Sequence, residues 1–266
     1  MSNISLEDQS VLTISNLFFA YGSNEKSNDV IRDLSLNIKA GEIVSVLGAS
    51  GCGKSTLLNL IAGLLKPKGG AIDFGTNKNK AKINKQIGYI FQEDALLPWR
   101  TVESNLMLAA EIRQDISENT VEERIANYLN VFHLHKNILN QYPSQLSGGM
   151  RQRISILQTL MFDPQIILLD EPFSALDFFT KLRLEGELYQ LIKEQNRAAI
   201  LITHDIDEAI AISDRIMIMA KGGAITNEFA INFEQAKRSP EEVRGTKQFA
   251  EYYHSVWSQL RQVIEK

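Results

Sequence analysis

The 266-residue sequence predicts an α/β protein with a mostly parallel β-sheet that is covered on both faces. Two observations lead to this prediction. Short, continuously apolar runs such as "IVSVLG" and "IILL" are typical of strands that are buried on both faces of a parallel sheet. Longer stretches with apolar residues at steps of three and four separate these runs in the second half of the chain. Such alternation favours parallel strands joined by crossover helices.

The first part of the chain is predicted to be rich in strands. Its apolar, β-branched segments alternate in places and end at glycine. The predicted strands are residues 11–22, 31–48, 71–75 and 86–92. Residues 54–65 have helical spacing and stop before Pro67. We interpret the lysine-rich stretch Lys66–Lys85 as a solvated hairpin loop; the alternative is a basic patch that binds phospholipid or nucleic acid.

Helices dominate from about Glu93, and strands return near residue 165. The predicted helices of this middle region are residues 101–113, 120–134 and 148–162. Strands 165–172, 198–205 and 215–223 then alternate with helices 178–196 and 205–213. We therefore expect an α/β core split over residues 11–92 and 157–225. A helical subdomain of residues 93–156 and a C-terminal helical extension of residues 226–266 complete the predicted organisation.

The end of the chain is predicted to form an amphipathic helix. Its apolar face is expected to dock on the core of the same chain, and a contact between subunits is the alternative. The residues on that face are Phe249, Tyr252, Tyr253, Val256, Trp257, Leu260 and Val263.

Composition excludes several classes of protein. The formal net charge of −4 gives no global case for binding nucleic acid, which usually requires a basic excess. The single cysteine, Cys52, cannot form an internal disulfide. The N-terminal residues lack the layout of a secretion signal, and no apolar run approaches the ~18 residues that span a bilayer. We expect another chain to provide any membrane-spanning part.

The segment Gly48–Thr56, "GASGCGKST", fits the phosphate-binding pattern G-x-x-x-x-G-K-[ST] between a predicted strand and a predicted helix. Its backbone is expected to surround the phosphates of ATP. Lys54 would reach the β- and γ-phosphates, Ser55 would ligate Mg²⁺, and Thr56 would approach the α-phosphate. The alternative is a plain glycine-rich turn. The residues expected to bind the nucleotide are Gly48, Ser50, Gly51, Cys52, Gly53, Lys54, Ser55 and Thr56.

Cys52 allows two interpretations. The simpler one is a small residue that fits inside the phosphate loop. Its place near a helix N-terminus is also expected to lower the pKa of the thiol. We hypothesise that alkylation of Cys52 blocks nucleotide binding, in which case ATP should slow the alkylation.

The ends of two strands are expected to supply catalytic groups at the carboxyl edge of the sheet. Asp170 ends an apolar strand and is expected to hold Mg²⁺ through water. Glu171, on the other side of the pleat, is expected to orient or deprotonate the attacking water. His204 follows another strand and is expected to contact the γ-phosphate. The alternatives are an ordinary acidic turn before Pro172 and a structural histidine at the end of its strand. Gln92, which follows another predicted strand, is explained equally well as a polar loop residue.

The segment Gln145–Arg153, "QLSGGMRQR", resembles a second anion site because a serine and two glycines open a predicted helix. It has no lysine of its own, and Gly48–Thr56 already surrounds one set of phosphates. The economical arrangement is a homodimer in which Ser147, Gly148 and Gly149 bind the γ-phosphate of ATP held by the other copy. The alternative is a capped helix start with Ser147 as N-cap.

Taken together, the motifs resemble those of the ATP-binding subunit of ABC transporters. "GASGCGKST" is similar to the Walker A motif of that family, "IILLDE" to its Walker B motif and "LSGGM" to its signature. The resemblance spans roughly residues 11–223. It implies a RecA-like P-loop NTPase fold with an antiparallel β subdomain and an inserted α-helical subdomain. It also implies that Tyr21 stacks on adenine, that Gln92 is a catalytic and Mg²⁺-binding Q-loop residue, and that Asp177 belongs to a nucleotide-contacting D-loop.

For function, this resemblance implies an ATPase that drives transport. The expected assembly contains a homodimer of ATPase subunits, transmembrane permease subunits and, indirectly, an extracytoplasmic substrate-binding protein. The chain would lie peripherally on the cytoplasmic face of the membrane, with ATP and Mg²⁺ as cofactors and no nucleic acid. A soluble ABC protein that acts on nucleic acid or ribosomes, and a P-loop kinase, are the alternative functions. The former usually has fused ATPase units or coiled-coil inserts, and the latter would leave Gln145–Arg153 unexplained.

Leu96, Leu97 and Trp99, followed by "RTVESNL", are similar to a segment of the nitrate, sulfonate and taurine importers. They are expected to expose an apolar patch to a helix of a membrane partner, with packing inside the helical subdomain as the alternative. Met150 replaces the commoner glutamine of the wider family, which leaves the backbone donors intact. The tail lacks the basic, proline-containing segment frequent in this branch. Sulfonates, taurine, nitrate and thiamine-precursor solutes therefore all stay open.

Overall fold

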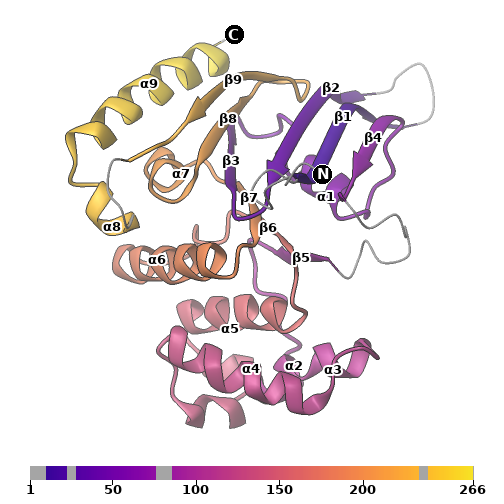
Figure 1. Cartoon of the computed structure of the whole chain (residues 1–266), viewed down its shortest axis with the longest axis vertical. Coiled ribbons are helices and arrows are strands. Elements are labelled where there is room, and N and C mark those ends of the chain that lie inside the picture. Colours follow the sequence, from indigo (N-terminus) through magenta and orange to yellow (C-terminus); the bar gives the residue numbers. More distant parts are fainter. Residues whose placement is uncertain (1–9, 23–27, 76–85, 234–238, 266) are drawn as a thin grey trace, which may run out of the picture.

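A computed structural model of the chain describes residues 10–22, 28–75, 86–233 and 239–265 and places them in two β-sheets with surrounding helices (Figure 1). Within these residues, the larger sheet has six strands in the order β5-β6-β7-β3-β8-β9, and the smaller has three in the order β2-β1-β4. The larger sheet comprises β3 (Ile43–Gly48), β5 (Ile87–Ile90), β6 (Ile166–Asp170), β7 (Ala198–Ile202), β8 (Arg215–Met219) and β9 (Ile225–Ala230). The smaller sheet comprises β1 (Ser10–Tyr21), β2 (Asn28–Lys39) and β4 (Gly69–Asp73).

The prediction of a mostly parallel sheet is confirmed. The described strand pairs of the larger sheet are parallel, except that β9 is antiparallel to β8. Within the smaller sheet, β1 is antiparallel to both β2 and β4. The structure therefore has the antiparallel part that the resemblance implied.

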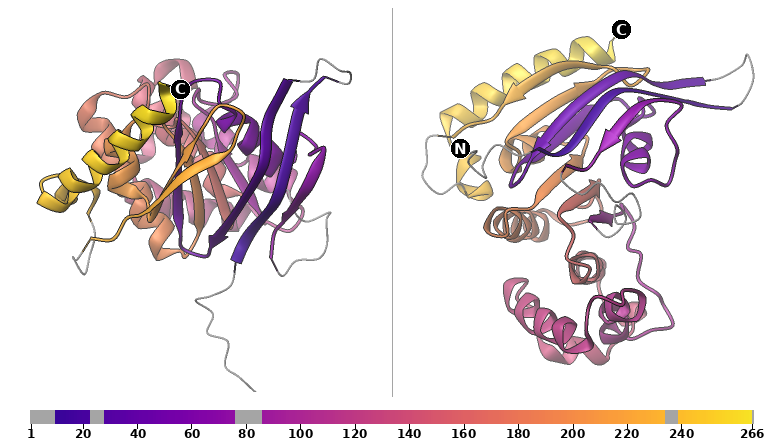
Figure 2. Two further views of the ribbon diagram at one scale, coloured as in Figure 1. Left: turned by 90° about the horizontal axis from the view of Figure 1, so that it is seen from above. Right: turned by 45° about the vertical axis from the view of Figure 1, so that its right-hand side comes forward.

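Alternate residues of the central strands enter two different apolar cores. Ile167 and Leu169 of β6 pack in one cluster with α5, α6, α7 and α9, whereas Ile166 and Leu168 pack in the other with α1 and the three-stranded sheet. Because both faces are buried, these strands have continuous apolar runs. Helices cover one face, and the second face is covered partly by a sheet (Figure 2).

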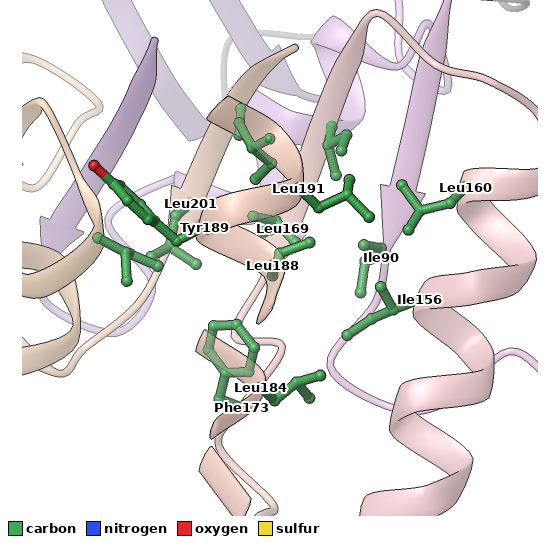
Figure 3. Packing of buried hydrophobic residues seen from close by; sticks show 14 of the residues in the cluster. Ile90, Ile156, Leu160, Leu169, Phe173, Leu184, Leu188, Tyr189, Leu191 and Leu201 are labelled. Carbon is green, nitrogen blue, oxygen red and sulfur yellow. The ribbon is translucent and has the colours of Figure 1, made fainter. Parts of the chain in front are cut away.

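The described helices are α1 (Lys54–Ile61), α2 (Val102–Leu106), α3 (Leu108–Ile112), α4 (Glu118–Val131), α5 (Gly148–Met161), α6 (Phe178–Glu194), α7 (Ile206–Ile212), α8 (Pro240–Val243) and α9 (Lys247–Ile264), with 3₁₀ turns at Lys136–Asn140 and Pro143–Gln145. Among them, α2, α3, α4 and α5 form a separate layer below the larger sheet (Figure 1). Buried side chains join this layer to the sheet: Ile156 of α5, Leu188 of α6 and Ile90 of β5 lie in one cluster (Figure 3).

Three details differ from the sequence-based expectations. Strands β4 and β5 belong to different sheets, so Lys66–Lys85 does not connect a hairpin; its residues 76–85 lie outside the described residues. The predicted helix 101–113 is divided into α2 and α3 at Met107. Residues 226–230, expected to begin the helical extension, belong to the edge strand β9 (Ile225–Ala230) because this segment pairs with β8.

The C-terminal helix α9 packs against α7 and β3, as predicted for docking on the core of the same chain. Phe249, Val256 and Leu260 are buried in this contact. Trp257, which the helical pattern placed on the same face, is 48% exposed. None of the helices among the described residues combines the length and apolarity that a membrane crossing requires.

Candidate nucleotide-binding site

A cleft of about 620 Å³ opens beside the loop that joins β3 to α1. Residues that follow β3, β5, β6 and β7 contribute to it, as expected for a site at the carboxyl edge of parallel strands. Its lining residues are Tyr21, Val30, Gly48, Ser50, Gly51, Gly53, Lys54, Ser55, Thr56, Gln92, Glu171 and His204. Most of the residues predicted around the first phosphate site therefore share one cleft.

The loop between β3 and α1 has the shape of a phosphate cradle. Gly51 and Gly53 have φ angles of 76° and 114°, a left-handed region that glycine adopts without a steric penalty. Lys54 is buried, and its Nζ donates hydrogen bonds to the carbonyl oxygens of Gly48 at 2.8 Å and Ala49 at 3.0 Å. The ammonium group is thus held inside the loop, where it can interact with a phosphate.

Cys52 does not line the cleft, and the pKa of its thiol differs from the expectation based on the sequence. Its side chain is only 1% exposed, and burial raises the pKa of the thiol although Lys54 lowers it. Desolvation disfavours the thiolate more than the neighbouring charge and hydrogen bonds favour it. The prediction of a lowered pKa was therefore wrong, and the thiol fills space behind the loop.

Asp170 does not line the cleft itself but lies next to Ser55, which does. The Ser55 hydroxyl donates a hydrogen bond to Asp170 Oδ1 at 3.3 Å, and the Tyr89 hydroxyl approaches Oδ2 at 3.3 Å. Burial raises the pKa of Asp170, although both donors lower it. One hydroxyl and one carboxylate suit Mg²⁺, which commonly takes one or two protein oxygens and completes its shell with water and substrate phosphates. Clusters of three or more metal-binding side chains are absent from the described residues.

Glu171 faces away from Asp170 and contacts the other two predicted catalytic residues. Its Oε2 lies 3.2 Å from His204 Nδ1 and 3.4 Å from Gln92 Nε2. The residue has left the strand: its φ is 48°, and its N–H donates to the Ile202 carbonyl at 2.9 Å. The reversed direction thus comes from a strained turn after β6, whereas the sequence suggested the strand pleat.

Tyr21 lies at the rim of the same cleft. Its ring is 48% exposed and contacts Phe19 edge-on, with a centroid distance of 4.9 Å. Its hydroxyl is 3.3 Å from Thr56 Oγ1. An exposed aromatic surface beside a phosphate loop offers a face on which a base can stack.

The loop at Ser147 lies in a different hollow of about 440 Å³, whose lining shares no residue with the first cleft. Ser147 caps α5 by accepting a hydrogen bond from the Met150 N–H at 3.3 Å, so the predicted N-cap is present. Gly148, Gly149 and Asp177 also line this hollow. Asp177 caps α6 by accepting a hydrogen bond from the Thr180 N–H at 3.1 Å. Hydrogen bonds with the Thr180 side chain and with this N–H lower the pKa of the Asp177 carboxyl group. Asp177 thus lies beside the Ser147 loop and outside the first cleft.

A sequence profile described as "ABC transporter" matches residues 31–174, which is more than half of the chain. The chain belongs to the ABC transporter family of ATP-binding proteins. The matched residues include the first phosphate loop, the Ser147 loop and the Asp170–Glu171 pair.

Two curated relatives resemble this ABC ATP-binding protein over most of their length. YtlC of Bacillus subtilis (strain 168), named an uncharacterized ABC transporter ATP-binding protein, is 39% identical over 253 residues, which cover 94% of this chain and 96% of YtlC. SsuB of Bacillus licheniformis, named an aliphatic sulfonates import ATP-binding protein, is 40% identical over 224 residues, which cover 83% of this chain and 86% of SsuB. The resemblance to importers of this branch is confirmed.

A solved ATP-binding cassette has the same fold. The cassette MJ0796, determined as a dimer in a post-hydrolysis state with ADP and Pi bound, is similar with a TM-score of 0.71 at 33% identity. The match covers 84% of this chain and 99% of the cassette. The predicted P-loop NTPase fold is therefore confirmed.

Sequence reasoning missed one residue that lines this ABC protein's cleft and one that contacts Asp170. Val30 lines the cleft, and Tyr89 hydrogen-bonds Asp170 and Asn59. Burial, together with the Asp170 carboxylate, raises the pKa of Tyr89, so its hydroxyl keeps its proton and acts as a donor. The pairing of β5 with β6 creates this contact, and a local motif carries no signal of that pairing.

Proposed function

We propose that this chain is the ATP-hydrolysing subunit of an importer for a small solute of the sulfonate, nitrate or taurine type. Its membership of the ABC family and the name of its relative SsuB support import as the process. In this proposal a separate permease crosses the membrane, and a substrate-binding protein outside the membrane delivers the solute. The chain itself lies on the cytoplasmic face.

One observation supports the proposal: the Gly48–Thr56 loop and the Ser147 loop, the two segments expected to bind anions, line separate hollows. The first has a lysine, a magnesium-type oxygen pair and a carboxylate paired with histidine. The second has helix-terminal N–H groups without a lysine. Two copies arranged head-to-tail would combine the first feature of each chain with the second feature of the other, and a two-fold dimer forms two such sites.

The described side chains have clear tasks in such a site. The loop at Gly48–Thr56 binds the phosphates, with Lys54 neutralising their charge, and Tyr21 stacks on the base. Glu171 accepts hydrogen bonds and is placed to orient the attacking water, while His204 and Gln92 hold its carboxylate in position. Mg²⁺ bound near Ser55 and Asp170 would supply charge neutralisation at the phosphates.

ATP binding across two chains provides the driving force for a conformational change. Phosphates that touch both chains favour the closed dimer, and hydrolysis removes that preference. A permease attached to both chains would then move between two orientations. Trp99 is 72% exposed and is our proposed contact for the permease, whereas Leu96 is buried inside the helical layer and does not belong to that patch.

The composite site is tested by mixing two inactive variants. Lys54→Ala removes the lysine of the first feature, and Gly148→Asp places a negative charge in the second. A mixed dimer of the two variants contains one intact site. We expect the mixture to recover up to about a quarter of wild-type ATPase activity, since half of randomly mixed dimers are hybrids with one working site of two. Activity no higher than the sum of the separate variants would contradict the proposal.

Gly148 is the suitable position because a side chain there meets little of its own chain. A Cβ at Gly148 would find Arg151 at 4.0 Å, whereas a Cβ at Gly149 would lie 3.1 Å from Thr180. An acidic residue in the first turn of α5 is also favoured by the helix dipole. Thermal unfolding should therefore show that Gly148→Asp is at least as stable as wild type. Purification from membranes tests the importer assignment: an integral membrane chain should accompany the protein.

A further inference from the structure

A buried cluster of charged residues lies behind His204, outside the nucleotide cleft. Lys181 and Glu185 come from α6, Asp205 and Glu208 from the start of α7, and Arg244 from the end of α8. Lys181 Nζ is 2.5 Å from Asp205 Oδ2 and 2.8 Å from Glu208 Oε2. Arg244 Nη2 is 2.5 Å from Glu185 Oε2. The cluster thus joins the C-terminal segment to the turn that follows β7.

The cluster contains more acids than bases. Glu185 and Glu208 have almost no exposed side-chain surface, Asp205 is partly exposed, and only Lys181 and Arg244 oppose them. Glu185 Oε1 and Glu208 Oε1 have no hydrogen-bond partner, so neither carboxylate is fully satisfied. Removal of one cation would leave a buried carboxylate uncompensated, which is costly.

His204 depends on its backbone for its position. Its imidazole is 68% exposed and contacts Glu171 at 3.2 Å. The next residue, Asp205, is fixed from three directions: it caps α7 through the Glu208 N–H, its own N–H donates to Thr203 Oγ1, and it pairs with Lys181. Lys181 therefore anchors the backbone that carries the imidazole.

Lys181 has a competing partner on its own helix. Glu185 Oε1 is 3.8 Å from Lys181 Nζ, one helical turn away. Arg244 now neutralises Glu185. Without Arg244, the unpaired Glu185 carboxylate would attract Lys181 away from Asp205.

We propose that Arg244 is a positioning residue for ATP hydrolysis: by neutralising Glu185 it keeps Lys181 on Asp205 and so holds His204 against Glu171. The C-terminal segment that follows β9 is thereby part of the hydrolytic apparatus as well as a packing element. This inference rests on the proposed ATPase function.

The test compares the full-length protein with Arg244→Met and with the double variant Arg244→Met/Glu185→Gln. We expect Arg244→Met to lower kcat at least fivefold with KM for ATP changed less than twofold, since the phosphate loop is untouched. The double variant should recover at least half of the wild-type kcat because Glu185 no longer competes. A purely structural role would lower the melting temperature of Arg244→Met and leave kcat at saturating ATP unchanged, and that result would overturn the proposal.

A second variant covers the case in which Arg244→Met does not fold. Lys181→Met/Glu208→Gln removes Lys181 together with its buried partner, so Glu208 is not left without its cation while Asp205 loses its anchor. Its kcat should also fall at least fivefold at unchanged KM; a wild-type kcat would contradict the proposal.

An NMR measurement separates failure of this inference from failure of the proposed function. The imidazole resonance of His204, assigned with His204→Gln, should respond to Glu171→Gln in the wild-type background and lose that response in the Lys181→Met/Glu208→Gln background. The contact can thus be tested even in a protein without ATPase activity. An equal response in both backgrounds would overturn the inference alone.

Discussion

At the scale of single residues, the site depends on two adjacent carboxylates that point in different directions. Asp170 is the last residue of β6 and lies against Ser55 and Tyr89. Glu171 adopts a left-handed backbone conformation, which is costly for a residue with a β-carbon and persists where the surroundings enforce it. Glu171 is held in this conformation by the hydrogen bond from its N–H to the Ile202 carbonyl and by its contacts with His204 and Gln92. The strained turn therefore separates the carboxylate that lies beside Ser55 and Tyr89 from the one that lies beside His204 and Gln92.

This separation predicts the behaviour of Glu171→Gln. The amide is nearly the same size and keeps a hydrogen-bonding oxygen, so ATP affinity should stay within about twofold of wild type. It cannot accept a proton from water, and hydrolysis should fall on the order of 10²–10⁴-fold. Nucleotide binding by fluorescence titration and single-turnover hydrolysis would measure the two effects. An unchanged hydrolysis rate would exclude Glu171 as the water-orienting group.

At the scale of elements, α6 and α7 hold a carboxyl group whose protonation changes on folding. Burial raises the pKa of Glu208 to about 7, although Lys181 lowers it. In the unfolded chain this group titrates near 4.5. Between these two pH values the folded chain binds more protons than the unfolded chain, so the free energy of unfolding falls as pH rises.

Glu208→Gln should remove this part of the pH dependence. The wild-type free energy of unfolding is expected to have an extra downward slope between pH 5 and pH 7, of at most about 1.4 kcal/mol per pH unit. Urea denaturation at several pH values measures the slope for both proteins. The exposed Glu122→Gln on α4 is the matched control and should keep the wild-type slope. Parallel curves for wild type and Glu208→Gln would contradict the buried, protonated Glu208.

The elements also show which features the sequence could predict. The loop Gly48–Thr56, the acid pair and the capped start of α5 are contiguous segments, so their local patterns placed them correctly on strands, helices and turns. Strand partners are different, because pairing joins segments far apart in the chain. The partners of β4 and β5, the edge strand β9 and the contact of Tyr89 with Asp170 all depend on such pairing. The burial of Cys52 likewise follows from packing behind the loop, and its position near a helix N-terminus does not predict this burial.

At the scale of the whole molecule, the first phosphate loop and the Ser147 loop line two separate hollows of one chain, and the proposed dimer would combine them. The Ser147 loop begins α5 in the helical layer, whereas Lys54 begins α1 beside the sheet (Figure 1). The two hollows share no lining residue, and in the proposed dimer one bound ATP uses both features because a second chain supplies one of them. In this proposal, hydrolysis of the shared ATP causes such a dimer to dissociate. A variant that binds ATP without hydrolysing it should therefore accumulate the associated state.

The mass of Glu171→Gln with ATP and Mg²⁺ tests this consequence directly. Light scattering after size exclusion should give twice the chain mass of 29.9 kDa. The same protein with ADP should elute as a monomer, because ADP lacks the phosphate that reaches the second chain. Glu171→Gln/Gly148→Asp is the matched control: its phosphate loop is intact, yet the added carboxylate repels that phosphate, so its mass should stay at that of one chain. A doubled mass for this control would place the contact between chains elsewhere, and a single-chain mass for Glu171→Gln with ATP, alone and with its membrane partner, would contradict the shared site.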